Sequence, residues 1–182
     1  DWIPDILGRL QAPLGCTFLL GNHDLRLKQV SPLLEQMRRL QHVDVGCQNQ
    51  TLHWGGVEIE ISGNEQPWFE RHPPPLESKP DTRPAEDRSR TLRIGLSHSP
   101  DQIGWARRQQ LDLLLAGHTH GGQARFPLIG PILAPSLYGS KFASGVFYLP
   151  PTLMHVSRGI AGTHAMRWWC PPEVSLLTLR NP

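Results

Sequence analysis

The spacing of apolar residues in the first part of the chain predicts two helices with a strand between them. Apolar positions in residues 3–10 recur every three or four residues, as on one face of a helix, and the apolar run at 16–20 predicts a buried strand. Ser31 and Pro32 are expected to supply the N-cap and the first turn of a second helix over residues 31–40.

Alternating apolar and polar residues then predict the strands of a sheet. Residues 50–61 contain two such stretches around a Gly-Gly pair, so we expect a hairpin whose second strand is half exposed. Residues 92–96 alternate in the same way. Ser99 and Gln102 are expected to form an N-cap and a capping box for a short helix, which leads to a buried strand at 111–116.

The last part of the chain predicts more strands, and one long loop interrupts the pattern earlier. Short apolar segments at 145–149, 152–156 and 173–179 are separated by Pro-Pro pairs and are expected to be strands. Residues 70–91 hold five prolines and nearly balanced charges, which predicts an extended, solvated loop. The alternation of helices and strands indicates an α/β fold.

Composition sets broad limits on this picture. At 182 residues the chain is expected to form a single domain over 1–182, and a mean hydropathy of −0.34 is ordinary for a globular protein. The three cysteines lie far apart in the sequence, which predicts buried free thiols rather than a disulfide framework. A net charge of +2 does not predict a nucleic-acid-binding surface, and we expect no nucleic acid partner.

Three histidine-bearing turns share one arrangement, in which an apolar run ends in a tight polar turn. They are FLLGNHD at 18–24, IGLSHSPD at 94–101 and LLLAGHTH at 113–120. In α/β sheets, functional groups collect on the loops beyond the carboxyl ends of the strands. We therefore expect the three turns to converge at one site.

The side chains in these turns suit a divalent metal ion. Imidazole nitrogens and an amide oxygen form a mixed ligand set, which Asn22, His98, His118 and His120 would supply. On an extended segment, side chains two residues apart point the same way, so His118 and His120 are expected to face one metal cluster. The glycines that surround these two histidines are expected to allow positive φ and a close approach of metal or phosphate.

The motifs resemble the last three signature blocks of the calcineurin-like metallophosphoesterases, whose full set is DxH, GDxxD, GNH[D/E], H and GHxH. The matching residues are 21–24, His98 and 117–120, in that order. The longer stretches VSRGIAG at 156–162 and CPPEVSLLTL at 170–179 are similar to a bacterial branch of the family that contains YkuE-like and YaeI-like phosphohydrolases. The resemblance implies a β-sandwich flanked by helices, in αββα order.

The resemblance also implies a role for each matching residue. Asn22, His98 and His118 would bind the second of two divalent metal ions (Mn, Fe, Zn or Mg), and His120 would bind the first. A hydroxide between the two ions would attack phosphorus.

Two neighbouring residues would assist this reaction without binding metal. His23 would hydrogen-bond the phosphoryl oxygens or protonate the leaving group. Asp24 would orient His23 from behind.

The chain departs from the family pattern because residues 1–182 contain no DxH and no GDxxD. We expect these blocks, and the first strands of the sandwich, to precede residue 1. Without the bridging aspartate one site keeps three ligands and the other keeps only His120. This polypeptide alone is therefore expected to bind one divalent ion weakly and to be a poor catalyst.

The substrate implied by the resemblance is a phosphate-containing small molecule or a lipid-linked phosphate. Arg158 is a candidate for binding its phosphate group. Membrane association, if it occurs, is expected to come from a segment before residue 1. Two alternatives stay open: a non-catalytic binding module on the same fold, and a nuclease of this fold, which the near-neutral charge disfavours.

Overall fold

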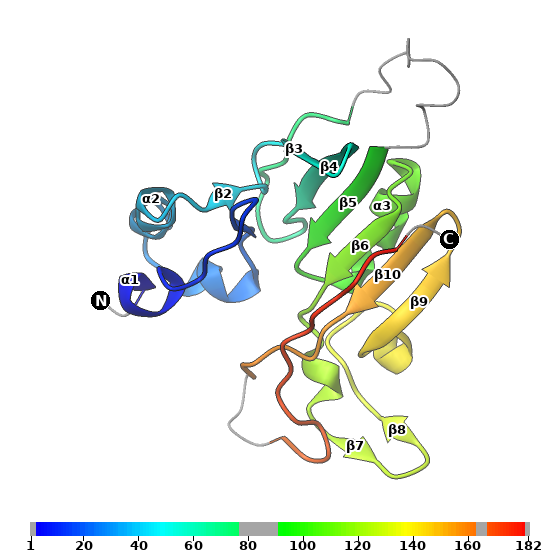
Figure 1. Cartoon of the computed structure of the whole chain (residues 1–182). Coiled ribbons are helices and arrows are strands. Elements are labelled where there is room, and N and C mark those ends of the chain that lie inside the picture. Colours follow the sequence, from blue (N-terminus) through cyan, green and yellow to red (C-terminus); the bar gives the residue numbers. More distant parts are fainter. Residues whose placement is uncertain (1–2, 77–90, 163–166, 181–182) are drawn as a thin grey trace.

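The computed structural model describes residues 3–76, 91–162 and 167–180, and its centre is a six-stranded mixed sheet (Figure 1). The strand order is β3-β4-β5-β6-β10-β9. The four inner strands run parallel, and β3 and β9 pair antiparallel at the two edges. The bounds are β3 Gln50–Trp54, β4 Val57–Asn64, β5 Thr91–Ser97, β6 Leu113–Ala116, β9 Gly145–Leu149 and β10 Thr152–Val156. The predicted α/β class is confirmed.

One face of the sheet is covered by α3 (Ile103–Arg108) and forms the main core. Leu114 and Met154 on neighbouring parallel strands are fully buried there, together with Ala106 of the helix and Phe142 of a later turn. Burial of each large apolar side chain contributes about 1.5–3 kcal/mol, so this face stabilises the fold on which the site is built.

The opposite face of the sheet carries the end of the chain, which does not form the predicted strand. Residues 173–179 have no strand geometry, and the backbone of this segment is held by one bond from the Glu173 amide to the Gly159 carbonyl. A hollow of about 470 Å³ separates the segment from the sheet and is lined by apolar side chains that include Leu96, Leu115 and Val174.

The N-terminal elements lie to one side of the sheet (Figure 1). They are α1 (Ile3–Leu7), β1 (Thr17–Phe18), α2 (Ser31–Arg39) and β2 (Val43–Asp44), and β1 pairs with β2 in a separate parallel ribbon. Both predicted helices are confirmed, although α1 is shorter than expected. The predicted buried strand is only two residues long and half-buried.

Two predictions about helix starts were wrong. The N-cap of α2 is Val30 rather than Ser31, because Ser31 already has helical geometry and no side chain caps this end. Ser99 does cap the turn η3 (Pro100–Gln102) by accepting a hydrogen bond from the Asp101 amide. Gln102 forms no capping box, because its side chain hydrogen-bonds instead to Asn64 and to the Gln66 carbonyl.

The β3–β4 hairpin is confirmed, but its second strand is more buried than predicted. Gly55 and Gly56 have positive φ, as a tight two-residue turn requires. Glu60 was expected to face solvent and is buried, because Arg93 of β5 pairs with it at 2.9 Å between Nε and Oε2.

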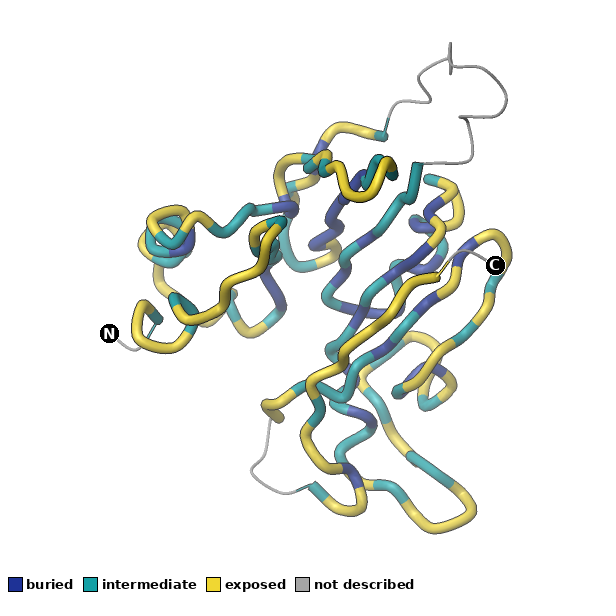
Figure 2. The backbone as a smooth tube through the Cα atoms, viewed as in Figure 1, coloured by how far each residue is buried: buried dark blue, intermediate teal, exposed yellow. Residues whose placement is uncertain are grey.

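A second hairpin, β7 (Arg125–Phe126) and β8 (Gly130–Pro131), projects away from the sheet and is followed by the turn η5 (Gly139–Phe142) (Figure 1). No residue of this hairpin is buried, in contrast to the centre of the sheet (Figure 2). Among the helices in the described part of the chain, none is long and apolar enough to cross a membrane.

The predictions for the Pro-rich loop and the cysteines are met only in part. Residues 70–76 are irregular, and most of the predicted loop at 70–91 lies outside the described residues. The three thiols are free, but only Cys170 is buried, whereas Cys47 is exposed.

Candidate metal centre

The three predicted turns meet beyond the carboxyl ends of β1, β5 and β6. The Asn22 Oδ1 atom lies 2.8 Å from His98 Nε2, and His118 Nδ1 lies 3.1 Å from the same nitrogen. Asn22 and His118 are 96 positions apart in the sequence. The predicted convergence of the three turns is confirmed.

This cluster of three atoms fits a divalent ion. Metal bonds to imidazole nitrogen and to oxygen are about 2.0–2.2 Å long, so two donors at a right angle lie about 3 Å apart. The two separations at His98 Nε2 have this size, and each of the three atoms can offer a lone pair. Within residues 3–76, 91–162 and 167–180, no three His, Cys, Asp or Glu side chains form a metal-binding group. This cluster contains two histidines, and its third donor is the amide oxygen of Asn22.

The ligand rings are held from outside by two further contacts. The His118 ring donates a hydrogen bond to the Pro135 carbonyl, which holds the orientation of the ring. The Trp68 ring packs on His98 and on His118, with centroids 4.9 Å away in both cases. Trp68 follows β4 in a stretch without a histidine or a glycine turn, so no sequence signal pointed to it.

The turn that carries His118 and His120 is not extended, and this prediction was wrong. Both histidines have positive φ, 69° and 51°, and the following Gly121 also has a positive φ. Side chains with a Cβ adopt this region at a cost of about 1–2 kcal/mol. Thr119 between them is fully buried and donates a hydrogen bond to the Ala143 carbonyl at 2.7 Å, which helps to hold the turn.

His120 lies in the same turn but is not joined to the cluster of three. Its ring hydrogen-bonds Gln123, and its backbone carbonyl accepts hydrogen bonds from Arg167 and from the Cys170 thiol. The described residues show no hydrogen bond between the His120 ring and Asn22, His98 or His118. Three of the four predicted ligands are therefore in contact.

His23 and Asp24 lie in the turn η1 (Asn22–Arg26), next to the cluster. His23 is exposed to solvent, as a group that contacts substrate must be. The Asp24 Oδ2 atom accepts a hydrogen bond from the Gly21 amide at 2.7 Å, whereas the predicted partner was the His23 ring. The contact seen for Asp24 therefore shapes the backbone of the turn.

Gly21 is required at its position for steric reasons. A Cβ atom there would lie 2.5 Å from the His98 ring, although the backbone of Gly21 is in an extended conformation. The glycine of the GNHD motif thus lets the His98 ring pass close to the chain that carries Asn22.

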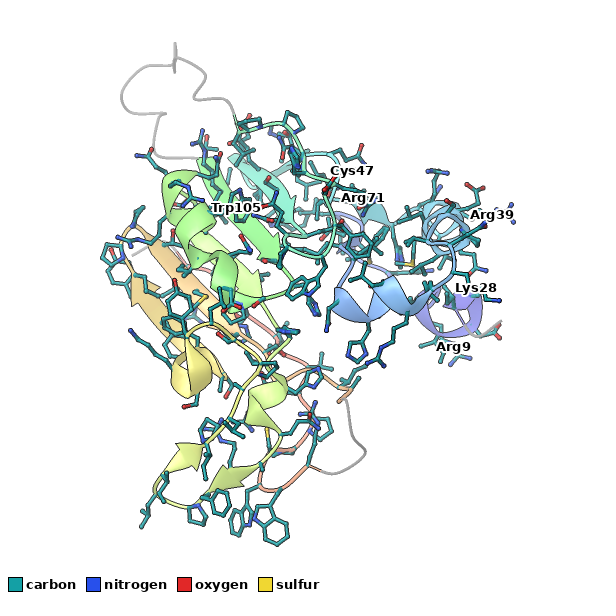
Figure 3. All side chains as sticks on the ribbon, turned by 180° about the vertical axis from the view of Figure 1, so that it is seen from behind. Arg9, Lys28, Arg39, Cys47, Arg71 and Trp105 are labelled. Carbon is teal, nitrogen blue, oxygen red and sulfur yellow. The ribbon has the colours of Figure 1, made fainter. Side chains whose placement is uncertain are left out.

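A buried ion-pair network fixes the start of this turn, and sequence reasoning missed it. The Glu65 carboxylate is fully buried and accepts hydrogen bonds from the Leu20 amide and from two nitrogens of Arg71. Arg71 also pairs with Asp44 at 2.8 Å. Figure 3 shows Arg71 at the junction between the N-terminal elements and the sheet, close to Cys47.

The network determines the protonation of its members. Burial alone would lower the pKa of Arg71, but its hydrogen bonds to Glu65 and Asp44 outweigh burial and raise the pKa. The guanidinium therefore stays charged. Cys47 is exposed as a residue, but partial desolvation of its thiol and the nearby Asp44 carboxylate raise the pKa of that thiol, although Arg71 opposes this.

The clustered histidines are held in their neutral form. Burial, followed by repulsion from His118, His120 and His23, lowers the pKa of His98 to about 4. Burial is also the main cause that lowers the pKa values of His118 and His120. Neutral imidazole is the form that binds metal, so no proton has to leave these rings near pH 7.

Arg158 lies beside the histidine turn and already has a partner. Its Nε atom is 3.5 Å from Glu173 Oε2, a long ion pair that does not satisfy the Nε–H group with a hydrogen bond. Partial burial would raise the pKa of Glu173, but a hydrogen bond from Ser175 and the contacts with Arg158 outweigh it and lower the pKa.

Comparisons with known proteins place the chain in a family. It is 32% identical to phosphodiesterase YaeI of Escherichia coli over 122 residues, which is 67% of this chain and 42% of YaeI. It is 29% identical to the metallophosphoesterase YkuE of Bacillus subtilis over 180 residues, 97% of this chain and 60% of YkuE. No protein-family model and no solved structure match it.

A third relative extends the range of named activities. The chain is 32% identical over 91 residues to LpxG of Chlamydia muridarum, a UDP-2,3-diacylglucosamine pyrophosphatase, over 46% of this chain and 28% of LpxG. The chain spans about half the length of the curated relatives that it matches, or less. The chain belongs to the calcineurin-like metallophosphoesterases, in the branch of YkuE and YaeI.

Proposed function

We propose that this chain carries part of the active site of a metal-dependent phosphoesterase, which hydrolyses a phosphomonoester, a phosphodiester or a pyrophosphate. The observation that carries the proposal is the contact of Asn22 Oδ1 and His118 Nδ1 with His98 Nε2. The relatives support a hydrolase, since they are named a phosphodiesterase, a metallophosphoesterase and a pyrophosphatase. The name of LpxG supports a lipid-linked phosphate as one possible substrate class.

The proposed cofactors are two divalent ions, of Mn, Fe, Zn or Mg. Asn22, His98 and His118 would hold one ion, and His120 is the proposed ligand of a second. A bound divalent ion supplies Lewis-acid activation of water and neutralises charge on the phosphoryl oxygens. Because the pKa values of the histidines are lowered, their lone pairs are available at neutral pH.

His23 is the proposed proton donor to the leaving oxygen. It is exposed beside the three-atom cluster. The backbone of its turn is held by the Asp24 carboxylate, which accepts a hydrogen bond from the Gly21 amide. We propose that Asp24 positions His23 through this backbone contact. Arg158 is a proposed phosphate contact, since its long, partly exposed ion pair with Glu173 can exchange for a phosphate oxygen.

The proposed architecture is a single domain in which the six-stranded sheet is one half of a β-sandwich flanked by helices. The sheet face opposite α3 supports this, because it lines an apolar hollow of about 470 Å³. A second sheet would pack against this face in the αββα order of the family.

Two substitutions in the complete protein test the division of roles. His118→Ala should lose bound metal and activity together. His23→Asn should keep the metal, while turnover of a phosphodiester with an alcohol leaving group falls by about 10²–10⁴, as is typical for loss of a general acid. The exposed His53 on β3 offers a control, and His53→Asn should change neither quantity.

Equal metal loss in the His118 and His23 variants would contradict these roles. Full metal binding without turnover of any phosphate ester would favour the alternative, a non-catalytic binding module.

A further inference from the structure

The segment that follows the histidine turn exposes several large apolar side chains to solvent. This apolar arm is residues 126–138, and none of its residues is buried (Figure 2). Leu128 at the hairpin tip is fully exposed, and Leu133 and Leu137 are 79% and 90% exposed. Monomeric proteins rarely expose contiguous apolar surface of this kind unless it binds something.

Two tryptophans extend the arm from a distant part of the sequence. Trp168 bridges to Ala124, exchanging backbone hydrogen bonds with Gln123 and Arg125 at 2.8 and 2.9 Å. Its ring lines a hollow of about 380 Å³ together with Phe126, Ile132 and Leu133. Trp168 and Trp169 are 55% and 69% exposed. Exposed indole rings are characteristic of surfaces that lie at the boundary between water and lipid.

The last residues of the arm are fixed to the body of the protein. They are held by Asp101, which accepts hydrogen bonds from the Ser136 hydroxyl at 2.6 Å and from the Leu137 amide at 3.1 Å. The Pro135 carbonyl accepts the hydrogen bond from the His118 ring. The exposed apolar side chains are therefore presented by an anchored segment that contacts the candidate metal centre directly.

The charge around the arm indicates what covers it. From Leu113 to Pro172 the sequence contains no Asp or Glu, whereas Arg125, Lys141, Arg158 and Arg167 lie in this stretch. All acidic residues of the chain lie outside it, although the whole chain carries a net charge of only +2. Two carboxylates from outside the stretch contact it, Asp101 at Ser136 and Glu173 at Arg158, so four cations face two anions. An excess of cations beside an uncharged apolar surface matches anionic lipid headgroups over an acyl layer.

We propose that the apolar arm with Trp168 and Trp169 inserts into the interface of an anionic phospholipid bilayer. In this position the turn with His118 and His120 lies near the level of the headgroup phosphates. Docking depends on side chains that are outside the metal cluster, so it does not require catalysis or bound metal. Docking would bring the phosphate group of a lipid close to the candidate metal centre. Small soluble esters would reach the same site by diffusion.

Vesicle binding by the full chain without added metal tests the proposal. The chain should bind vesicles of phosphatidylcholine and phosphatidylglycerol (1:1) at least tenfold more tightly than pure phosphatidylcholine, and high salt should reduce the difference. The double variant Leu128→Asp, Leu137→Asp should lower the affinity at least tenfold, since it removes two apolar side chains that become buried in the lipid on binding. Leu25→Asp, Leu27→Asp is the matched control, because both leucines are exposed and lie outside the arm, in the turn η1 and directly after it.

A second readout does not depend on variants that alter the arm. Brominated acyl chains should quench Trp168 and Trp169, and the quenching should persist in Trp54→Phe, whose ring is exposed on the β3–β4 hairpin. Equal binding by the arm variant and the control would overturn the proposal, as would equal affinity for neutral and anionic vesicles. Loss of self-association in the arm variant without any vesicle binding would assign the arm to a protein interface instead.

Discussion

The two halves of the candidate metal centre are held by different kinds of contact. Asn22 follows a backbone that is fixed by a buried ion-pair network, in which Glu65 binds the Leu20 amide and Arg71. His118 lies in a turn that is held by hydrogen bonds to backbone carbonyls, from Thr119 to Ala143, from its own ring to Pro135 and from Arg167 to His120. The first half uses an ion-pair network, and the second uses hydrogen bonds to backbone carbonyls.

The difference has an electrostatic consequence for a site that binds phosphate. The charged network lies behind the Asn22 turn, and its two carboxylates share the single guanidinium of Arg71, which leaves one net negative charge. The stretch that carries His118 contains no carboxylate from Leu113 to Pro172, so no fixed negative charge from it opposes an anionic ligand. Each half can be disturbed separately, and the expected effects differ in size.

The largest effect is expected from Glu65→Ala. The change leaves the half-buried Arg71 with Asp44 as its partner and removes the buried acceptor of the Leu20 amide. Loss of one partner in a buried ion pair costs about 3–5 kcal/mol of unfolding free energy. Urea unfolding measures this loss, and metal affinity should fall as well because the Asn22 turn is freed.

The matched control is Glu35→Ala, which removes ion pairs with Arg38 and Arg39 on the surface of α2. Exposed pairs of this kind contribute less than about 1 kcal/mol. Similar losses in the two variants would show that the Glu65 network is not the main support of this half.

The next largest effect is expected from Gly121→Ala in the half that contains His118. The residue has a φ of 66°, and an added Cβ would lie 2.5 Å from the Cys170 Sγ atom. The backbone conformation and the overpacking together should cost about 2–4 kcal/mol. Gly139→Ala separates the two causes, because Gly139 has a φ of 58° and open space around it, so it should cost only about 1–2 kcal/mol in thermal unfolding.

A smaller effect is expected from acid, which acts where the two halves meet. The unfolded chain protonates His98 near pH 6.5, whereas the folded protein does so only near pH 4, so the unfolded state binds more protons between these values. The unfolding free energy of the metal-free protein should therefore fall by about 1–2 kcal/mol as the pH drops from 6.5 to 4, less than the full shift because the ring is only half-buried. His98→Gln should show a shallower pH dependence, and an unchanged slope would contradict the assignment.

The smallest effect on stability is expected at the apolar arm. Leu128→Ala should change the unfolding free energy by less than about 0.5 kcal/mol, because the side chain is fully exposed. Leu114→Ala on the covered face of the sheet should cost about 2–5 kcal/mol. A large loss at Leu128 would mean that the arm is covered by the protein itself.

Sequence patterns predicted the sheet and the convergence of the turns because both depend on local signals. Alternation located β3, β4 and β5, an apolar run located β6, and a histidine after each apolar run located the site. The same signals could not predict Glu65 or Trp68, since neither lies in a motif and both act through neighbours distant in sequence. These signals also predicted an extended conformation for the histidine turn, whereas His118 and His120 have positive φ. This conformation goes with contacts to residues distant in sequence, such as Ala143, which local patterns do not show.

The central claim is that Asn22, His98 and His118 together hold a divalent ion. Calorimetric titration of the chain with Mn²⁺ or Zn²⁺ tests it most directly. We predict weak binding of one ion, which Asn22→Ala and His118→Ala abolish and which His120→Ala leaves nearly unchanged. Binding of two ions per chain, or binding that survives loss of Asn22 and His118, would contradict the account.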